Sequence, residues 1–544
     1  MNRVLFLVGG ILMALHFSCC NDLKKQEVRT VFRYNESKGI SSLDPAFANS
    51  QRLWWPDFQL YNALLEMNDS LRICPAIAHR WEVSENGLVY SFFLRQDVYF
   101  HDHPVFKAGK GRKVIATDFV YSFNRLLDHK TASPGAWVFN NVDQSNVNTS
   151  FQAINDSVFQ IKLKNRFAAF PELLTMVYCS VVPKEVVDFY GDDFRSHPVG
   201  TGPFMLKTWR EGEKLVLVKN PNYFQKDNTG QRLPYLDAVS ITFINDKQSE
   251  FLEFVKGNLD FLSGVQTAYR NELLTRNGKL NPKYDQRFSM SVLPYLNTEY
   301  LGCMIDPSKM SENPLLQKKL RLAINYGFDR AKMLKYLRNN IGTPAYWGII
   351  PKGLPGYTED LPGYSYDPDR SAQLLTEAGF PNGEGLPEIS LLTTADYLDL
   401  CEFIQHDLAQ VNIRVKIEVS TGATFRDMIA NSKVQFFRAS WIADYPDAEN
   451  YLSLFYSSNF SPKGPNYSHF KNTEFDKLYE SSVSENNETK RIQLYQNMNS
   501  IVVSESPLVP LYYDKVVRFY PKNISGFIGN PLNILKLKYV KKTN

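Results

Sequence analysis

The sequence lacks the short motifs that mark common hydrolases, nucleotide-binding proteins and thiol oxidoreductases. It contains no G-x-S-x-G, H-E-x-x-H, G-x-x-x-x-G-K-[ST] or C-x-x-C pattern. It also has no block of five or six like charges. Its 61 basic residues nearly balance its 57 acidic ones, which argues against a nucleic-acid partner. Nothing in the sequence therefore favours an enzyme, a cofactor or a nucleic-acid-binding protein.

Cysteine is scarce, with six residues in a chain of 544. Beyond an N-terminal pair, the four others are far apart, so the chain is not a small domain held together by disulfide bonds. Whether they are free core residues or form one or two bridges stays open at this point. These four residues are Cys74, Cys179, Cys303 and Cys401.

The N-terminus has an apolar run that is too short to span a membrane. Arg3 is followed by 14 residues, 4–17, whereas a membrane-spanning helix needs about 20. Residues 1–20 are typical of a secretory signal, and a cysteine at the break resembles the lipobox of bacterial lipoproteins. We expect Cys20, or alternatively Cys19, to carry the lipid, with residues 21–30 as a polar tether. The simpler alternative is an ordinary cleaved signal peptide.

Helical and strand patterns are mixed along the chain, and the length predicts two or three lobes. Asn86-Gly87 predicts a hairpin, alternating residues predict strands at 159–163, 413–419 and 508–520, and Thr117 is expected to cap a helix. Asn313-Pro314 and Asp367-Pro368 predict two further helix starts. Residues 198–204 (PVGTGPF) predict a tight passage between lobes. The expected class is α/β or mixed α+β, without internal repeats.

One cluster has the residue types of a metal site. His101-Asp102-His103 offers imidazole and carboxylate groups, but residues so close together on a loop rarely converge on one ion. A polar turn is the favoured interpretation, and no metal site is predicted.

The segment 436–456 (FFRASWIADYPDAENYLSLFY) carries the most specific chemistry. Arg438, Trp441 and Asp444 recur at every third position. In a strand this spacing places side chains on both faces, whereas in a turn or bulge it can direct them into one cleft. A carboxylate binds an ammonium and a guanidinium binds a carboxylate, so the set suits a zwitterionic peptide. An internal Arg–Asp ion pair beside a core tryptophan is an equal alternative on this tract alone.

Further segments, in order along nearly the whole chain, carry a family resemblance. They are Ser42-Leu43-Asp44-Pro45, LVYSFFLRQDVYFHD at 88–102 with Ala116-Thr117-Asp118-Phe119, PVGTGPF with Asn222-Tyr223-Phe224, 254–260 (FVKGNLD), 321–330 (RLAINYGFDR), 366–381 (YDPDRSAQLLTEAGFP) and 441–452 (WIADYPDAENYL). With these segments the chain resembles the family 5 extracellular solute-binding proteins. These are the oligopeptide- and dipeptide-binding components of bacterial ABC importers.

The resemblance implies a clamshell of the periplasmic-binding-protein type II, with two main lobes and an inserted third lobe. Lobe I would comprise residues 27–65, 199–292 and 516–544, lobe II residues 66–198, and lobe III residues 293–515. The two main lobes would close on a ligand held between them.

The resemblance also implies roles for individual residues. Asp444 would hold the ligand's ammonium, Trp441 would line a side-chain pocket with Tyr445 beside it, and Arg438 would meet a ligand carboxylate. Asn49 and Ser50 are expected near the cleft on lobe I. The sequence departs from the family pattern where Asp447 is followed by Ala448, and where a longer basic loop follows His101-Asp102-His103.

The expected function is capture of small peptides for a membrane permease of an ABC importer. The protein would be a monomer, lipid-anchored on the periplasmic or cell-surface side of the bilayer, with no catalytic residues. Alternatives are the same fold binding an oligosaccharide, a nickel complex or a haem complex, or acting as a peptide sensor. A secreted hydrolase using Asp444 and Asp447 is a remote alternative.

Overall fold

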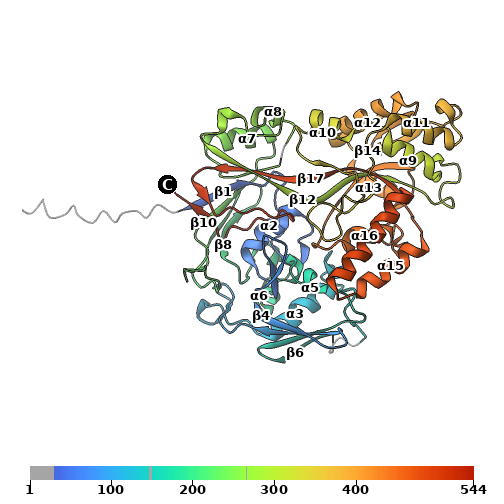
Figure 1. Cartoon of the computed structure of the whole chain (residues 1–544). Coiled ribbons are helices and arrows are strands. Elements are labelled where there is room, and N and C mark those ends of the chain that lie inside the picture. The colour runs from blue at the N-terminus through green and yellow to red at the C-terminus, as the bar shows by residue number, and fades with distance from the viewer. Residues whose placement is uncertain (1–29, 146–149, 265, 544) are drawn as a thin grey trace, which may run out of the picture.

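The computed structural model describes residues 30–145, 150–264 and 266–543 as a mixed assembly of helices and strands (Figure 1). The expected signal peptide at 1–20, both candidate acylation sites (Cys19 and Cys20) and residues 21–29 of the tether lie outside the described residues. Within the described ranges, no helix combines the length and the apolar character needed to cross a membrane.

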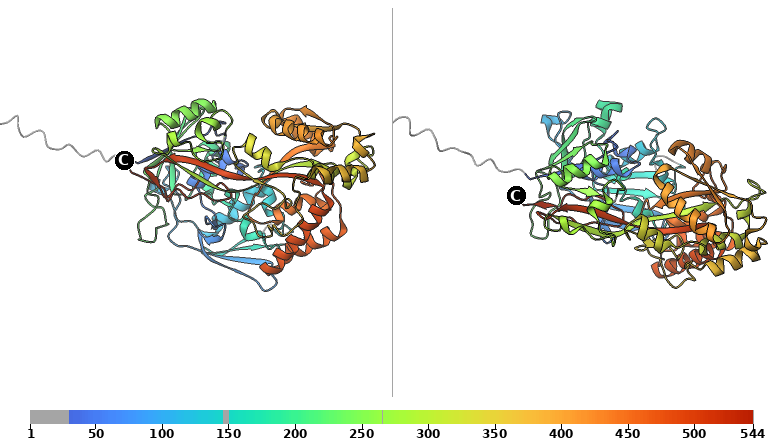
Figure 2. Two further views of the ribbon diagram at one scale, coloured as in Figure 1. Left: turned by 45° about the horizontal axis from the view of Figure 1, so that its top comes forward. Right: turned by 90° about the horizontal axis from the view of Figure 1, so that it is seen from above.

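A seven-stranded sheet forms the centre of the C-terminal half. Its strand order is β11-β17-β12-β16-β14-β15, and β13 also pairs with β17. The long antiparallel strands β12 and β17 run side by side through the middle of the molecule (Figure 1), and β17 is visible in Figure 2 as one red ribbon crossing it. The strands are β11 (Leu262–Ser263), β12 (Phe288–Cys303), β13 (Thr343–Pro344), β14 (Ile389–Thr393), β15 (Val415–Val419), β16 (Phe436–Ile442) and β17 (Leu508–Pro521).

Helices cover both faces of this sheet because its strands alternate buried apolar side chains. Leu301 and Val509 pack with one group of helices, and their neighbours Tyr300 and Leu508 pack with the other. The first group is α9 (Lys318–Tyr326), α10 (Arg330–Leu337), α11 (Pro368–Glu377) and α12 (Leu398–Gln410). The second group is α14 (Glu449–Leu452), α15 (Thr473–Ser484) and α16 (Glu488–Glu505). Figure 1 shows α9, α11 and α12 above the sheet and α15 and α16 below it.

Two smaller four-stranded sheets share one apolar core. One has the order β4-β5-β7-β6, and α3 packs on it with Phe119 and Phe123 fully buried. The other has the order β1-β10-β9-β8. Their bounds are β4 (Ala78–Val83), β5 (Val89–Leu94), β6 (Phe151–Asn155), β7 (Val158–Lys162), α3 (Ala116–Leu127), β1 (Val31–Asn35), β8 (Phe204–Arg210), β9 (Lys214–Lys219) and β10 (Ala238–Thr242).

Short elements complete the described chain. The strands β2 (Leu65–Met67) and β3 (Ile73–Pro75) pair with each other, as do β18 (Ile524–Ser525) and β19 (Lys541–Lys542). The remaining α-helices are α2 (Gln51–Leu60), α5 (Phe170–Leu173), α6 (Lys184–Tyr190), α7 (Lys247–Lys256), α8 (Arg270–Leu273) and α13 (Gly422–Ala430).

The chain leaves the β1 sheet and returns to it far along the sequence. β1 pairs in parallel with β10, and β2 to β7 are formed by the residues between them. The predicted passage at 198–204 lies at this return, immediately before β8. A Cβ at Gly200 or Gly202 would collide with the backbone of Leu60 at the end of α2, so both positions require glycine. The lobe boundaries themselves stay a prediction.

Most of the predicted local elements are present, with two differences at helix starts. The hairpin at Asn86-Gly87 and the strands near 159–163, 413–419 and 508–520 form as expected. Thr117, however, does not cap α3. The helix starts at Ala116, and the Asp118 carboxylate accepts the Ile115 N–H at 2.9 Å, which satisfies the free backbone donor one turn earlier.

Asn313 caps a single 3-10 turn at Pro314–Leu316, and α9 begins only at Lys318. The four cysteines after the N-terminal pair are all free. Cys179, Cys303 and Cys401 are buried, which makes them core residues and closes the disulfide question left by the sequence.

Candidate ligand-binding site

The tract that carries the predicted site begins as a regular strand, and this strand geometry separates two of the predicted site residues, Arg438 and Trp441. β16 pairs with β12 and β14, so alternate side chains point to opposite faces. Phe436 packs with the α9–α12 side, and Arg438, two residues further along the strand, points to the same face. Trp441 packs with the opposite cluster around α14 to α16. The structure therefore places Arg438 and Trp441 on opposite faces of the sheet.

Arg438 already has a carboxylate partner within the protein. Its guanidinium forms an ion pair with Glu299 and lies 3.1 Å from the centre of the Tyr397 ring. Both charged side chains are buried, at 8% and 2% exposure. Burial acts to lower the pKa of Arg438, but the adjacent Glu299 carboxylate outweighs it and raises the pKa above its usual value. The positive charge of Arg438 is thus neutralised from within.

Trp441 and Asp444 are joined by a residue that the sequence analysis missed. The Trp441 indole Nε1 donates to Asn450 Oδ1 at 2.9 Å, and the same oxygen accepts the Asp444 N–H at 3.2 Å. Asn450 Nδ2 donates to Asp444 Oδ2 at 3.4 Å. Asn450 lies in the short helix α14, and its buried amide fixes the turn between β16 and that helix.

Asp444 lies in a cavity built from distant parts of the chain. The side chain is exposed, and no basic side chain in the described ranges pairs with it. Crowding by the surrounding protein raises its pKa, and the Asn450 hydrogen bond only partly opposes this. A carboxylate in this position favours a positively charged partner.

We call this space of about 40 Å³ the Asp444 cavity. Four aromatic side chains and Met176 supply much of its wall, and none of the described residues lining it is basic. They are Ala48, Trp54, Phe58, Thr175, Met176, Val177, Tyr178, Ala443, Asp444, Tyr445, Leu532 and Ile534. The loop after β16 thus meets the α2 region, the segment after α5 and the C-terminal segment before β19.

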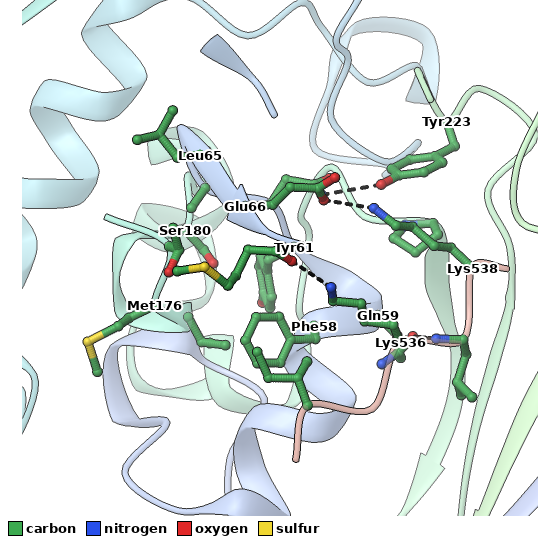
Figure 3. Close-up of a pocket in the computed structure, with 18 residues that line it drawn as sticks. Phe58, Gln59, Tyr61, Leu65, Glu66, Met176, Ser180, Tyr223, Lys536 and Lys538 are labelled. Carbon is green, nitrogen blue, oxygen red and sulfur yellow. Dashed lines mark hydrogen bonds and ion pairs between the residues drawn. The ribbon is translucent and has the colours of Figure 1, made fainter. Parts of the chain in front are cut away.

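A second space of about 60 Å³, which we call the inner cavity, is drawn in Figure 3. The two share Phe58, Thr175, Met176, Val177 and Ile534 in their walls. Figure 3 shows Tyr61 and Phe58 near its centre, Met176 at the left, Glu66 just above Tyr61, and Lys538 at the right.

Polar groups of the inner cavity are satisfied within the protein. Lys538 Nζ lies 2.7 Å from Glu66 Oε2, and Gln59 Nε2 donates to two backbone carbonyl oxygens at 2.8 and 2.6 Å. What the two cavities offer to a guest is therefore one carboxylate and a largely apolar wall.

The other predicted residues take different positions. Tyr445 lines the Asp444 cavity, and its hydroxyl donates to buried Glu449. Ser50 is at the N-cap position of α2, and its buried Oγ has no hydrogen-bond partner among the described residues. Exposed Asn49 lines a separate open hollow of about 1260 Å³. Asp444 and Tyr445 are thus brought together, Trp441 supports them through Asn450, and Asn49 and Arg438 lie elsewhere.

Comparison with known proteins identifies the family. Residues 72–463 match the bacterial extracellular solute-binding proteins, family 5. The chain belongs to this family.

Individual members of the family are identical to this chain at about a quarter of the aligned positions. A dipeptide-binding protein of Escherichia coli (strain K12) is 25% identical over 488 residues, covering 87% of each chain. Heme-binding protein A of Haemophilus influenzae is 27% identical over 491 residues, covering 87% of this chain and 85% of that one.

A solved structure agrees over almost the full length. The periplasmic binding protein DppA of Helicobacter pylori, an ABC-transporter-associated protein in complex with the peptide STSA, superimposes with a TM-score of 0.76 at 25% identity. The match covers 95% of this chain and 99% of that one. The mixed α/β clamshell of the family 5 solute-binding proteins is thereby confirmed as the fold.

In this family 5 chain the residues of the histidine cluster have separate partners. His101 is buried, its Nε2 lies 3.0 Å from Gly202 O, and burial lowers its pKa to about 4. Asp102 instead pairs with Lys110 at 2.8 Å. In the part of the chain that the structure describes, no group of three or more His, Cys, Asp or Glu side chains could hold a metal ion.

Proposed function

We propose that this family 5 protein captures peptides by their free amino end, with Asp444 as the group that binds the ammonium. The single observation that carries the proposal is a carboxylate that faces a cavity without a basic partner in the described chain. A charge-assisted hydrogen bond from an ammonium would neutralise it. Two relatives support this choice of guest, since one is a dipeptide-binding protein and the other was solved in complex with the peptide STSA.

The aromatic wall of the Asp444 cavity suits the same guest. Trp54, Phe58 and Tyr178 contribute ring surfaces beside the carboxylate. Aromatic faces attract cations, and this attraction is stronger in a site partly shielded from water. Burial raises the pKa of Tyr178, with Asp444 as a further cause, so its hydroxyl stays protonated and can donate a hydrogen bond.

The proposed cycle involves binding and closure, with no covalent chemistry. Lobe I (27–65, 199–292 and 516–544) and lobe III (293–515) would move relative to each other about β12 and β17, with lobe II (66–198) attached to lobe I. A peptide that contacts both sides favours the closed form through its differential affinity. The closed protein would then deliver the peptide to the permease of an ABC importer. An acylated Cys20 or Cys19 would anchor it on the periplasmic or cell-surface side of the membrane.

Two measurements test the proposal. Mass spectrometry of small molecules released by denaturing freshly purified protein should identify peptides. Calorimetry should then show that N-acetylation of such a peptide abolishes binding. Release of a haem, a metal complex or a sugar, or equal affinity for the acetylated peptide, would refute the peptide assignment.

A further inference from the structure

The walls of the Asp444 cavity expose more apolar surface than a sealed core would. Trp54, Phe58, Met176 and Leu532 all line this one cavity, and each remains only half-buried. They come from α2, from the segment after α5 and from the C-terminal segment, so no single element explains their common exposure. Grouped apolar side chains of this kind typically mark a surface that is covered by an apolar ligand group.

The inner cavity extends this apolar space away from Asp444. Phe58, Met176 and Val177 belong to both walls. At the far end, Lys538 and Glu66 neutralise each other, and Lys536 Nζ lies 3.0 Å from Asp69 Oδ1. A charged guest group would find no free charge of opposite sign there and would lose its hydration. An uncharged group loses little and gains apolar contact.

Met176 occupies the wall between the two spaces. Its unbranched thioether side chain can change rotamer with little strain, and it retains partial exposure. It is therefore suited to move aside for a long guest group and to close behind a short one.

We propose that the two cavities form the subsite for the side chain of the ligand's first residue, and that they select uncharged apolar side chains such as Leu, Met or Phe, with Met176 as the adjustable wall. This inference rests on the proposed function, because the first side chain is placed here only if Asp444 holds the adjacent ammonium. It adds a selectivity that ammonium binding alone does not require.

The test uses two series of synthetic peptides, X-Ala and X-Ala-Ala, with X as Gly, Leu, Phe, Trp, Lys or Glu. Binding to the wild-type protein is measured by calorimetry. We expect Leu and Phe to bind at least about 10-fold more tightly than Gly, and Lys and Glu to bind more weakly than Leu. Equal affinities across a series would overturn the inference.

A variant pair tests the part played by Met176. Met176→Ala should enlarge the shared space and improve the affinity for Trp relative to Leu by about 3-fold or more. The matched control is Met310→Ala, which removes another half-buried methionine, one that lines a surface hollow with Lys309 and Asn313. It should leave the ratio unchanged. An unchanged ratio in Met176→Ala, or the same change in both variants, would overturn the role of Met176.

The two proposals fail in different ways. If N-acetylated Leu-Ala-Ala binds as well as the free peptide, or if no free peptide of either series binds, the proposed function is wrong. If acetylation abolishes binding while all six first residues bind equally well, the function stands and the side-chain subsite is wrong.

Discussion

Replacing Asp444 with asparagine should separate ligand binding from folding. The substitution keeps the shape of the side chain and its contact with Asn450 but removes the negative charge. Once a ligand covers the carboxylate, loss of its hydrogen-bonded charge pair with an ammonium typically costs about 2–4 kcal/mol, which is roughly a 30- to 1000-fold loss of affinity. We therefore expect Asp444→Asn to bind peptides weakly while it remains folded.

The same substitution should stabilise the protein when no ligand is bound. The surrounding protein partly desolvates Asp444 and raises its pKa, so the folded state holds its proton more tightly than the unfolded chain does. Stability from this group is fully present below the ordinary pKa of 3.8 and is lost as the pH rises through the raised value. At pH 7 the ionised carboxylate is therefore unfavourable without a ligand, and asparagine removes that effect.

Thermal unfolding with and without peptide at pH 7 provides the assay. The wild-type protein should gain a higher melting temperature on adding peptide. Asp444→Asn should start higher and gain little. A matched control is Asp427→Asn, which removes an exposed carboxylate paired with Lys433 at 2.9 Å. If Asp444→Asn keeps the wild-type affinity, or melts below the wild type without ligand, the reasoning about this carboxylate is wrong.

Three other substitutions follow from buried or crowded groups. Asp57→Asn should stabilise the protein by about 1–3 kcal/mol at pH 7 but not below pH 4. Both buried carboxylate oxygens of Asp57 lack partners among the described residues, and burial, followed by the charge of Asp44, raises its pKa well above 3.8. Denaturant unfolding at the two pH values measures the difference. The wild-type protein should lose stability as the pH rises from about 5 to 8, and Glu172→Gln should reduce this loss. The reason is that burial, followed by the charge of Asp447, raises the pKa of Glu172 to about 7. Melting temperatures that fall equally in the wild type and the variant across this range would contradict the prediction. Gly202→Ala should destabilise the fold by more than about 2 kcal/mol, because its Cβ would collide with the backbone of Gln59 and Leu60; an unchanged denaturation midpoint would refute the close approach.

Local chemistry made much of the fold predictable. The β4–β5 hairpin follows from Asn86-Gly87, and Gly87 adopts the positive φ of 69° that such a turn requires. The start of α11 follows from Asp367, whose side chain accepts the Arg370 N–H at 2.8 Å. The start of α3 was harder to predict. Thr117 and Asp118 are both suitable capping residues, and in the structure the Asp118 carboxylate accepts hydrogen bonds from the Arg112 guanidinium and the Ile115 N–H.

The candidate site was predictable only where it lies within one segment. Asp444 stands out because its spacing from Arg438 and Trp441 and the family resemblance both point to it, and Tyr445 lies next to it in the same tract. Trp54 and Tyr178 could not be predicted, because no local pattern records that their segments meet the loop after β16. Arg438 and Trp441 show that residues close together in sequence can also lie apart in the structure. Their spacing allowed a shared cleft, but the regular pleat of β16 places them on opposite faces.

The Asp444 cavity combines two unfavourable features that one guest can relieve. The Asp444 carboxylate lacks a cation among the described residues, and the apolar surfaces of Trp54, Phe58 and Met176 remain partly exposed to water. An ammonium group removes the first feature, and an apolar group bonded close to it removes the second. Because the lining comes from both sides of the proposed clamshell, both gains require the closed form. Selectivity for the guest and the free energy of closure therefore have the same physical origin.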